Sequence, residues 1–313
     1  MLDTKQHETE LSVVVTVVEG GKALARCLSA LSQQDGHSEL DVIVPYDDTI
    51  ADVARLAAQF PRFKFLALGS LAPPGTVIDP IVEHELFDKR RAAGLDAAHG
   101  RLIGMLEDRG APRSDWAQAM ISEHAQREAA AIGGGVINVA KGAMNRAIFV
   151  CDYGRHVPPF AEGEAEYLTD INICYRRDAL QSVRELWIER YQETAVNWAL
   201  RDRGYRLWLS PKPVVLHSRT NAPISRTLSE RLQWGRVFGI QRGRRWSRSR
   251  AWASAAAATM LPFLLLVRQS RLLLTHGIRP GEFLPTVGAL MAVIPAWSLG
   301  EAIGYVQGAG ESS

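Results

Sequence analysis

The sequence predicts an α/β fold: a mostly parallel, Rossmann-like sheet flanked by helices, with a hydrophobic helical region appended at its C-terminal end. Two observations lead to this prediction. Between residues 11 and 130, short apolar runs rich in β-branched residues alternate with segments whose apolar residues recur at helical spacing. Strands and helices that alternate at this spacing form doubly wound sheets. Beyond residue 250, the chain instead carries two long stretches without a charged residue.

The first strand is predicted at 11–18, where the continuous run LSVVVTVV is typical of a strand buried on both faces. A helix follows, because Leu24, Cys27, Leu28 and Leu31 lie at helical spacing. The same two patterns predict further strands at 40–48, 63–68 and 101–106, and further helices at 49–60, 88–99 and 114–126.

Local end signals accompany two of these helices. Gly100 is a favourable C′ residue for the helix at 88–99, and Ser114 is a favourable N-cap for the helix at 114–126. Beyond residue 130, the residues at 130–139 are strand-like with a glycine cluster, and those at 150–168 form an acidic, mobile loop. The remaining pattern predicts a helix at about 193–203, ended by Gly204, then a short strand and a strand ending at His217.

Polar side chains follow three of the predicted strands. They are the segment from Thr16 to Glu19, the pair Asp47 and Asp48, and the pair Glu107 and Asp108. In open α/β sheets, ligands bind beyond the carboxyl ends of the strands, so these side chains mark the expected site. Neither the GxGxxG fingerprint nor the GxxxxGK[ST] phosphate loop is present, which excludes the two commonest nucleotide motifs.

The two ends of the chain differ in composition, which predicts a domain at 1–220 and a basic, hydrophobic helical region at 221–313. Residues 201–250 hold 13 Arg and Lys against 2 Asp and Glu, as expected for contact with phosphates or an anionic membrane. The three cysteines have no CxxC spacing, which favours a reducing compartment over disulfides or zinc. The polar start MLDTKQHETE does not resemble a signal peptide, so a cytosolic face is expected.

The uncharged stretches at 251–267 and 283–300 contain 17 and 18 residues. A spanning helix needs about 20 apolar residues, so both are borderline. They favour membrane contact, as a re-entrant hairpin or as helices in the interface, because arginines suited to anionic headgroups flank them. The alternative is a pair of buried helices that cover the sheet.

Several ordered blocks carry a family resemblance over roughly residues 11–220. They are LSVVVTVVEGGKALARCLSALSQQ, LDVIVPYDD, RRAAGLDAAHGRLIGMLEDRGAPRSDW, TDINICYRRDAL and QETAVNWALRDRGYRLWLSPKPVVLH. Together they resemble the family 2 glycosyltransferases of the GT-A fold. The resemblance implies an inverting transferase that moves a sugar from a nucleoside-diphosphate donor, with a UDP-sugar favoured, to a lipid-linked or glycan acceptor.

In that family the fourth strand ends in an aspartate motif, which here is Glu107-Asp108-Arg109. The resemblance makes Asp108 the candidate ligand of Mg²⁺ or Mn²⁺ and places Glu107 beside the donor. Family members often carry a third carboxylate where Arg109 stands, and an arginine there is suited to contact a phosphate directly. The alternative is an ordinary acidic turn before the next helix.

Further positions match donor-binding residues of the family. Thr16, Glu19 and Asp47, with Asp48 as the neighbouring choice, match residues that hold the base and ribose, although Asp is also common in plain turns. Arg91 matches an arginine near the diphosphate; the alternative is a solvated charge on a helix.

The family's catalytic aspartate falls on Glu193, with Gln192 at the position of the preceding acid. Glu193 is therefore the candidate general base, the role that an inverting transfer requires; the alternative is a first-turn glutamate favoured by the helix dipole. His217 matches a histidine that reaches the metal or phosphate in some members, whereas a lone histidine is more often structural.

Two other functions are compatible with the sequence. A sugar nucleotidyltransferase has a related architecture but usually carries a glycine-rich N-terminal loop, which VVEGGKA matches poorly. A catalytically inactive member serving as an assembly subunit is left open by Arg109 and Gln192. Nucleic-acid binding is not expected, because Trp234 and Trp246 alone provide no stacking platform. The expected location is the cytoplasmic face of a membrane, in a peripheral or re-entrant arrangement.

Overall fold

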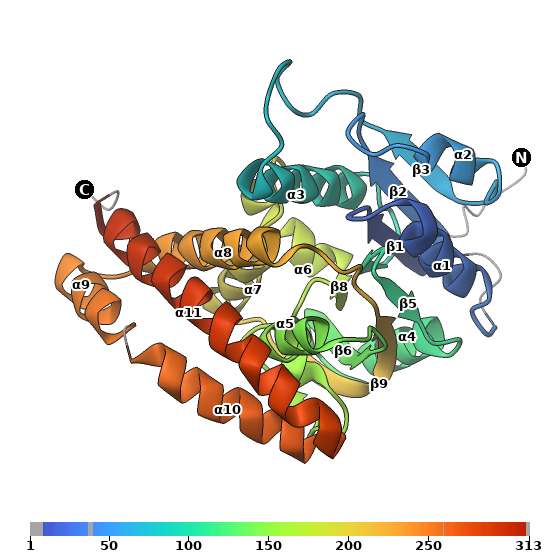
Figure 1. Ribbon diagram of the computed structural model, residues 1–313. Coiled ribbons are helices and arrows are strands. Elements are labelled where there is room, and N and C mark those ends of the chain that lie inside the picture. Colours follow the sequence, from blue (N-terminus) through green and yellow to red (C-terminus); the bar gives the residue numbers. More distant parts are fainter. Residues whose placement is uncertain (1–8, 37–39, 259, 311–313) are drawn as a thin grey trace, which may run out of the picture. The chain divides into compact units, whose positions relative to one another are not determined.

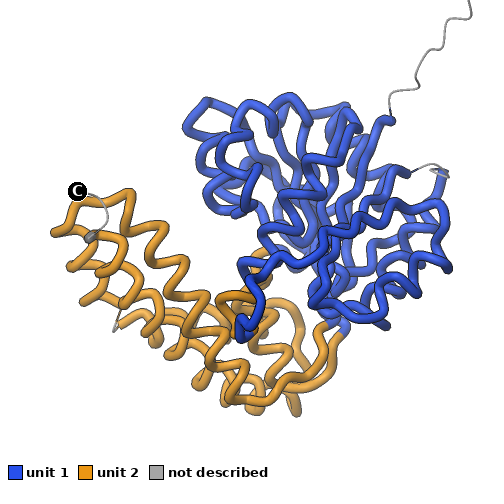
Figure 2. The backbone as a smooth tube through the Cα atoms, turned by 90° about the horizontal axis from the view of Figure 1, so that it is seen from above, with its two compact units in different colours: residues 1–77, 84–139, 156–218 blue, residues 78–83, 140–155, 219–313 orange. Residues whose placement is uncertain are grey.

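The computed structural model describes residues 9–36, 40–258 and 260–310 (Figure 1). The polar start at 1–8, used above for the signal-peptide expectation, lies outside the described residues. The chain divides into two compact units, which Figure 2 shows in different colours. Unit 1 comprises 1–77, 84–139 and 156–218, and unit 2 comprises 78–83, 140–155 and 219–313. The domain division at residue 220 stays a prediction, because a compact unit need not fold on its own.

Unit 1 is built on a single sheet. Its path among the described residues runs β3-β2-β1-β4-β8-β6-β9-β5, and β7 pairs with β9 in addition. The strand bounds are β1 Leu11–Thr16, β2 Asp41–Tyr46, β3 Lys64–Ala67, β4 Leu102–Glu107, β5 Gly110–Pro112, β6 Ala131–Asn138, β7 Gly163–Glu164, β8 Asn172–Arg176 and β9 Leu207–His217.

The strands β3, β2, β1 and β4 are parallel neighbours, as predicted from their apolar runs. Beyond β4 the sheet is mixed, because β8 pairs antiparallel with both β4 and β6. The antiparallel pairing of Leu106 with Asn172 places the start of β8 at the carboxyl end of β4. The fold class is therefore confirmed as a sheet flanked by helices, with a mixed second half.

The helices of unit 1 cover both faces of the sheet. Val13 and Val15 of β1 pack with Leu28 of α1 in one apolar cluster, whereas Val14 packs with Leu95 of α3 in the other. The helix bounds are α1 Gly21–Ser32, α2 Val53–Ala57, α3 Pro80–Asp96, α4 Trp116–Gln126, α6 Arg177–Gln181 and α7 Glu193–Asp202. The first turn of α3 belongs to unit 2. Short 3₁₀ turns lie at Gly154–His156 and Arg184–Leu186.

Three local predictions are wrong. Helix α3 ends at Asp96, so Gly100 is not its C′ residue; Gly100 instead lies against β1, where a Cβ would come within 2.5 Å of the Ser12 amide nitrogen. The N-cap of α4 is Asp115 rather than Ser114, and no side chain caps the helix. The first part of the loop expected at 150–168 is the last turn of α5 (Ala143–Tyr153), a helix that the sequence pattern did not predict.

Unit 2 is helical. Helices α8 and α11 pack closely through glycines spaced four residues apart: a Cβ on Gly304 would lie 2.2 Å from the Arg236 carbonyl oxygen, and one on Gly239 would lie 2.4 Å from that of Glu301. Helix α11 is long and apolar enough to cross a membrane by length and composition, and the bent pair α9 and α10 passes the same test together. The remaining bounds are α8 Ile224–Arg244, α9 Arg248–Ala257, α10 Leu261–Thr275 and α11 Pro280–Gly310.

Candidate active site at the carboxyl edge of the sheet

The parallel register brings the ends of β1 and β4 together. Thr16 pairs with Glu107, and the Asp108 amide donates a hydrogen bond to the Thr16 carbonyl oxygen at 3.0 Å. Thr16 is buried, and its hydroxyl has no hydrogen-bond partner among the described residues. The predicted aspartate motif therefore lies beside the segment that follows β1.

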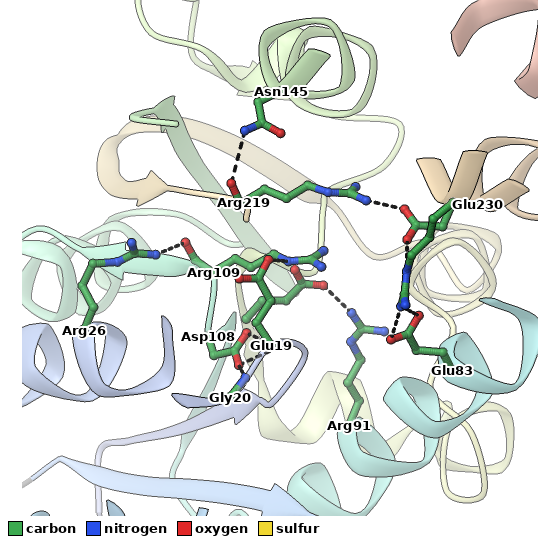
Figure 3. Close-up of polar contacts among 12 residues, drawn as sticks. Glu19, Gly20, Arg26, Glu83, Arg91, Asp108, Arg109, Asn145, Arg219 and Glu230 are labelled. Atoms are coloured by element: carbon green, nitrogen blue, oxygen red, sulfur yellow. Dashed lines mark hydrogen bonds and ion pairs between the residues drawn. The ribbon is translucent and has the colours of Figure 1, made fainter. Parts of the chain in front are cut away.

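Asp108 is fully buried and faces the turn before α1. Its carboxylate accepts hydrogen bonds from the backbone amides of Glu19, at 3.0 Å, and Gly20, at 2.7 Å (Figure 3). Gly20 has a φ of 69°, which favours glycine there. Burial raises the pKa of Asp108 to about 6, against the opposing effects of the Gly20 amide and the Arg109 charge. The carboxylate thus closes the turn at the start of a helix, where negative charge is stabilised.

Arg109 is held by the residue that follows the first strand. Its Nε donates to the Glu19 Oε1 at 2.8 Å, and both side chains are largely buried (Figure 3). Arg26 of α1 donates to the Arg109 carbonyl oxygen at 3.0 Å. Two predicted donor-binding residues are therefore a bonded pair, with the guanidinium fixed next to the aspartate motif.

Glu107 faces α3, on the other side of the motif. The Arg91 Nη2 lies 2.7 Å from its Oε1 (Figure 3). Burial, and then the nearby Asp170, raise the pKa of Glu107 to about 7, although Arg91 and Arg109 oppose the shift. The structure thus brings together Arg91 and Glu107, which the sequence analysis assigned separately to the donor.

Arg91 is the centre of a buried cluster of carboxyl groups. Besides Glu107, its guanidinium contacts Asp170 at 2.6 Å and Asp88 at 3.2 Å. Its Nε has no hydrogen-bond partner among the described residues. The sequence analysis missed Asp88 and Asp170. Asp88 lies three residues before Arg91 and was detectable from helical spacing, whereas Asp170 is placed here by the antiparallel β8.

Glu193, the candidate base, is the first residue of α7. Its Oε2 accepts a hydrogen bond from the Asp170 amide at 2.8 Å, which brings the two carboxyl groups close together. Burial, followed by the charge of Asp170, raises the pKa of Glu193 well above its usual range. The candidate base therefore belongs to the same cluster as Arg91 and Glu107.

The predicted residues after β2 take different positions. Asp47 is buried and accepts from Arg90 Nε at 2.9 Å and from the Thr49 amide at 2.8 Å, while Arg90 Nη1 donates to the Val17 carbonyl oxygen at 2.6 Å. This network ties the turns after β1 and β2 together. Asp48, by contrast, is exposed.

His217 ends β9 and is buried. It pairs with Gly110 of β5, and the Ser218 amide donates to the Arg109 carbonyl oxygen at 2.9 Å. The last predicted candidate is thus held beside the aspartate motif by the short strand that follows it.

The arrangement does not fit a divalent cation as it stands. Among the residues that the structure describes, no three His, Cys, Asp or Glu side chains are placed to hold a metal ion together. The Asp108 oxygens are directed to backbone amides, and Glu107 is paired with Arg91. Mg²⁺ and Mn²⁺ need several free oxygen ligands, so these carboxylates would first have to release their present partners.

Comparisons with known proteins give structural matches only. No family model and no curated protein matches the chain. S. aureus TarS 1–349 matches with a TM-score of 0.48 and 15% identity, covering 74% of this chain and 65% of that one. Its complex with UDP-GlcNAc matches with a TM-score of 0.47 and 13% identity over 71% and 66%. The mannosyltransferase PcManGT from Pyrobaculum calidifontis, in complex with GDP-Man and Mn²⁺, matches with a TM-score of 0.47 and 14% identity over 98% and 77%.

This chain spans just under two thirds of the length of both TarS chains. Because every TM-score is below 0.5, these matches carry no functional argument.

Proposed function

We propose that the chain is an inverting glycosyltransferase of the family 2 type, which transfers a sugar from a nucleoside-diphosphate donor, with a UDP-sugar favoured, to a lipid-linked or glycan acceptor at a membrane. The observation that supports this most is the convergence of Arg91, Arg109, Glu107, Asp108 and Glu193 at one edge of the sheet. That edge is where α/β folds bind their ligands.

The two arginines suit a diphosphate leaving group. Negative charge builds on that group as the bond to the sugar breaks, and fixed cations stabilise the charge as it develops. Arg109 is held by Glu19 and Arg91 by Glu107 and Asp170, so both guanidiniums are oriented before a donor arrives. Preorganised guanidiniums recognise phosphate oxygens with fixed geometry.

The reaction is a single displacement. The acceptor hydroxyl loses its proton to a carboxylate, for which Glu193 is the predicted base, and its oxygen forms a bond to the anomeric carbon. The bond between that carbon and the phosphate oxygen breaks, and its electron pair leaves with the nucleoside diphosphate. Attack opposite the leaving group inverts the configuration at the anomeric carbon.

The divalent cation stays a prediction from the family resemblance. Asp108 and Glu107 are already engaged by amides and by Arg91 and would have to release these partners to bind it. Activity measured after EDTA treatment, with and without added Mn²⁺, tests the requirement directly.

The exposed apolar residues of unit 2 support a membrane-associated acceptor. On α11 they form one stripe that contains no charged residue, and exposed Arg268 and Arg271 stand on α10 beside exposed Phe263 and Val267. Apolar side chains next to arginines suit an anionic lipid surface. The stripe on α11 comprises Leu284, Pro285, Gly288, Met291, Pro295, Leu299 and Ile303.

A donor screen tests the proposal. UDP-, GDP- and dTDP-sugars are compared by thermal shift, and the donor that stabilises the protein is then assayed for sugar transfer. We expect one donor class to raise the melting temperature and to support transfer that Glu193→Gln abolishes. The matched control is Glu189→Gln, which neutralises an exposed glutamate four residues earlier. Pyrophosphate release from a nucleoside triphosphate and a sugar phosphate would instead indicate a nucleotidyltransferase, and donor binding without turnover an inactive family member.

A further inference from the structure

The cluster around Arg91 contains two neighbouring carboxyl groups, those of Asp170 and Glu193. Asp170 stands just before β8, and Glu193 begins α7. The Asp170 amide donates to the Glu193 carboxyl at 2.8 Å, which brings the two carboxyl groups close together. Two neighbouring carboxylates repel each other when both are ionised, so such a pair favours a state with a single proton.

The surroundings keep one proton on the pair. Asp170 Oδ2 lies 2.6 Å from Arg91 Nη2, so the guanidinium holds one end of the pair in place. Burial is the largest influence on Glu193 and raises its pKa, and the Asp170 charge raises it further. The pair therefore holds one proton at rest and can accept a second.

Other titratable groups face this pair from the elements packed against it, and their negative charges favour the same singly protonated state. Arg91 and Asp88 come from α3, and Glu107 comes from β4. The hydroxyls of Tyr175, on β8, and Tyr191, before α7, are hydrogen-bonded to each other at 2.7 Å in a buried position. Asp88, Glu107, Asp170 and Glu193 all act on the single Arg91 guanidinium, so full ionisation of these carboxyls would leave excess negative charge in a buried place.

We propose that Asp170 and Glu193 form a carboxyl pair that shares one proton, clamped by Arg91, and that this pair, rather than Glu193 alone, takes up the proton of the acceptor hydroxyl. This inference rests on the proposed function. In the step, the hydroxyl gives its proton to the singly protonated pair while its oxygen bonds to the anomeric carbon and the nucleoside diphosphate departs with the electron pair of the broken bond. The pair then holds two protons and returns one to solvent.

The first test needs no substrate. The infrared difference spectrum between the wild-type protein and Glu193→Gln, recorded above the pKa of about 7 of Glu107, is expected to contain a protonated carboxyl band. Asp170→Asn should move the pH midpoint of that band downward, because Glu193 then loses a neighbouring negative charge. Glu189→Gln, the exposed control, should leave the band unchanged. A difference spectrum without that band, or a midpoint that Asp170→Asn does not move, would overturn the shared proton.

The second test measures the role of the pair in transfer. Asp170→Asn should lower kcat by about 100-fold or more, the range expected for loss of a general base, while the donor still raises its melting temperature. The acid limb of the pH profile should also move to lower pH. Asp170→Glu, which keeps the charge, should retain more activity than Asp170→Asn, and this comparison separates a chemical role from a structural one.

The failures of the two proposals are distinguishable. Unchanged kcat and an unchanged acid limb in Asp170→Asn would overturn the role of the pair while leaving the transferase function intact. Absence of transfer by the wild-type protein with every donor would overturn the catalytic role together with the proposed function. The infrared measurement tests the shared proton in either case.

Discussion

Two buried arginines, one in each unit, are paired with carboxyl groups in different ways. In unit 2, Arg231 is almost fully buried and meets Asp152 with both terminal nitrogens, at 2.5 and 3.1 Å. In unit 1, the Arg91 guanidinium is surrounded by carboxyl groups from several elements, Asp170 and Glu107 being the nearest. Arg231 is paired with a single bidentate carboxylate, whereas Arg91 is surrounded by more carboxyl groups than its one charge can neutralise.

The difference separates a structural role from a functional one. A bidentate pair satisfies both charges and fixes the packing of the helices that carry it. A cluster with more carboxyl groups than cations destabilises the fold unless some of those groups hold protons, and such clusters concentrate at functional sites. The imbalance in unit 1, rather than burial by itself, is what makes the carboxyl edge the candidate site.

The most disruptive test of this contrast is removal of each arginine. Arg91→Met should lower the free energy of unfolding by about 3–5 kcal/mol near neutral pH, because buried carboxylates lose their cation. The loss should shrink at acidic pH, where those carboxylates become protonated. Urea unfolding curves at the two pH values measure both effects.

The matched variant is Arg231→Met. Because it leaves one partly exposed carboxylate, Asp152, we expect a smaller loss that depends less on pH. Equal losses with the same pH dependence for the two variants would remove the distinction between the units.

The stability of the protein is expected to depend on pH, because several carboxyl groups in unit 1 have raised pKa values. Burial raises the pKa values of Glu193, of Glu107 to about 7 and of Asp108 to about 6. The folded protein therefore binds more protons than the unfolded chain between the unfolded value of about 4 and these folded values. Stability is then highest on the acidic side of this window and falls as the pH rises, by about 1.4 kcal/mol per pH unit for each extra bound proton.

Guanidinium unfolding across that window measures the slope. Glu107→Gln should flatten it, because one of the raised groups no longer titrates. A free energy of unfolding that increases with pH through the window would contradict the placement of these carboxyls.

Much of this framework could be predicted from the sequence. The runs at β1, β2 and β4 identify buried strands, and the run at β3 identifies a strand that is only partly buried. The helix ended by Gly204 was predicted to begin at about Glu193, where α7 begins. Asp170 was missed because its position depends on the antiparallel direction of β8, which no local pattern reveals. The association of Arg109 with Glu19 likewise depends on the long-range register of β4 against β1.

Glycine substitutions test how unit 2 is built. Gly304→Ala places a Cβ against the backbone of α8, 2.2 Å from the Arg236 carbonyl oxygen, and should lower the free energy of unfolding by about 1–3 kcal/mol. Gly288→Ala, on the same helix but with no atom within 4 Å, should raise it by about 0.5–1 kcal/mol. Thermal denaturation of the two variants compares them directly, and a stabilising Gly304→Ala would contradict the close packing of α8 and α11.

A smaller effect is expected at the proposed membrane surface. Met291→Ser removes an exposed apolar side chain from the stripe on α11 and should weaken binding to anionic phosphatidylglycerol vesicles by about tenfold, the loss of roughly 1.4 kcal/mol of apolar burial. Gln307→Ser, which alters an exposed polar side chain on the same helix, is the control and should bind as the wild type does. Vesicle co-sedimentation measures both, and equal binding by the two variants would contradict insertion of the stripe.

We propose above that the carboxyl edge of the sheet in unit 1 binds a sugar nucleotide. A crystal structure of the protein soaked with UDP, with and without Mn²⁺, tests it most directly. We expect electron density for the nucleotide at the ends of β1, β2 and β4, with its base towards Asp47 and its diphosphate within reach of Arg91 and Arg109. Density elsewhere on the molecule, or none at a saturating concentration of UDP, would contradict the assignment of this edge as the active site.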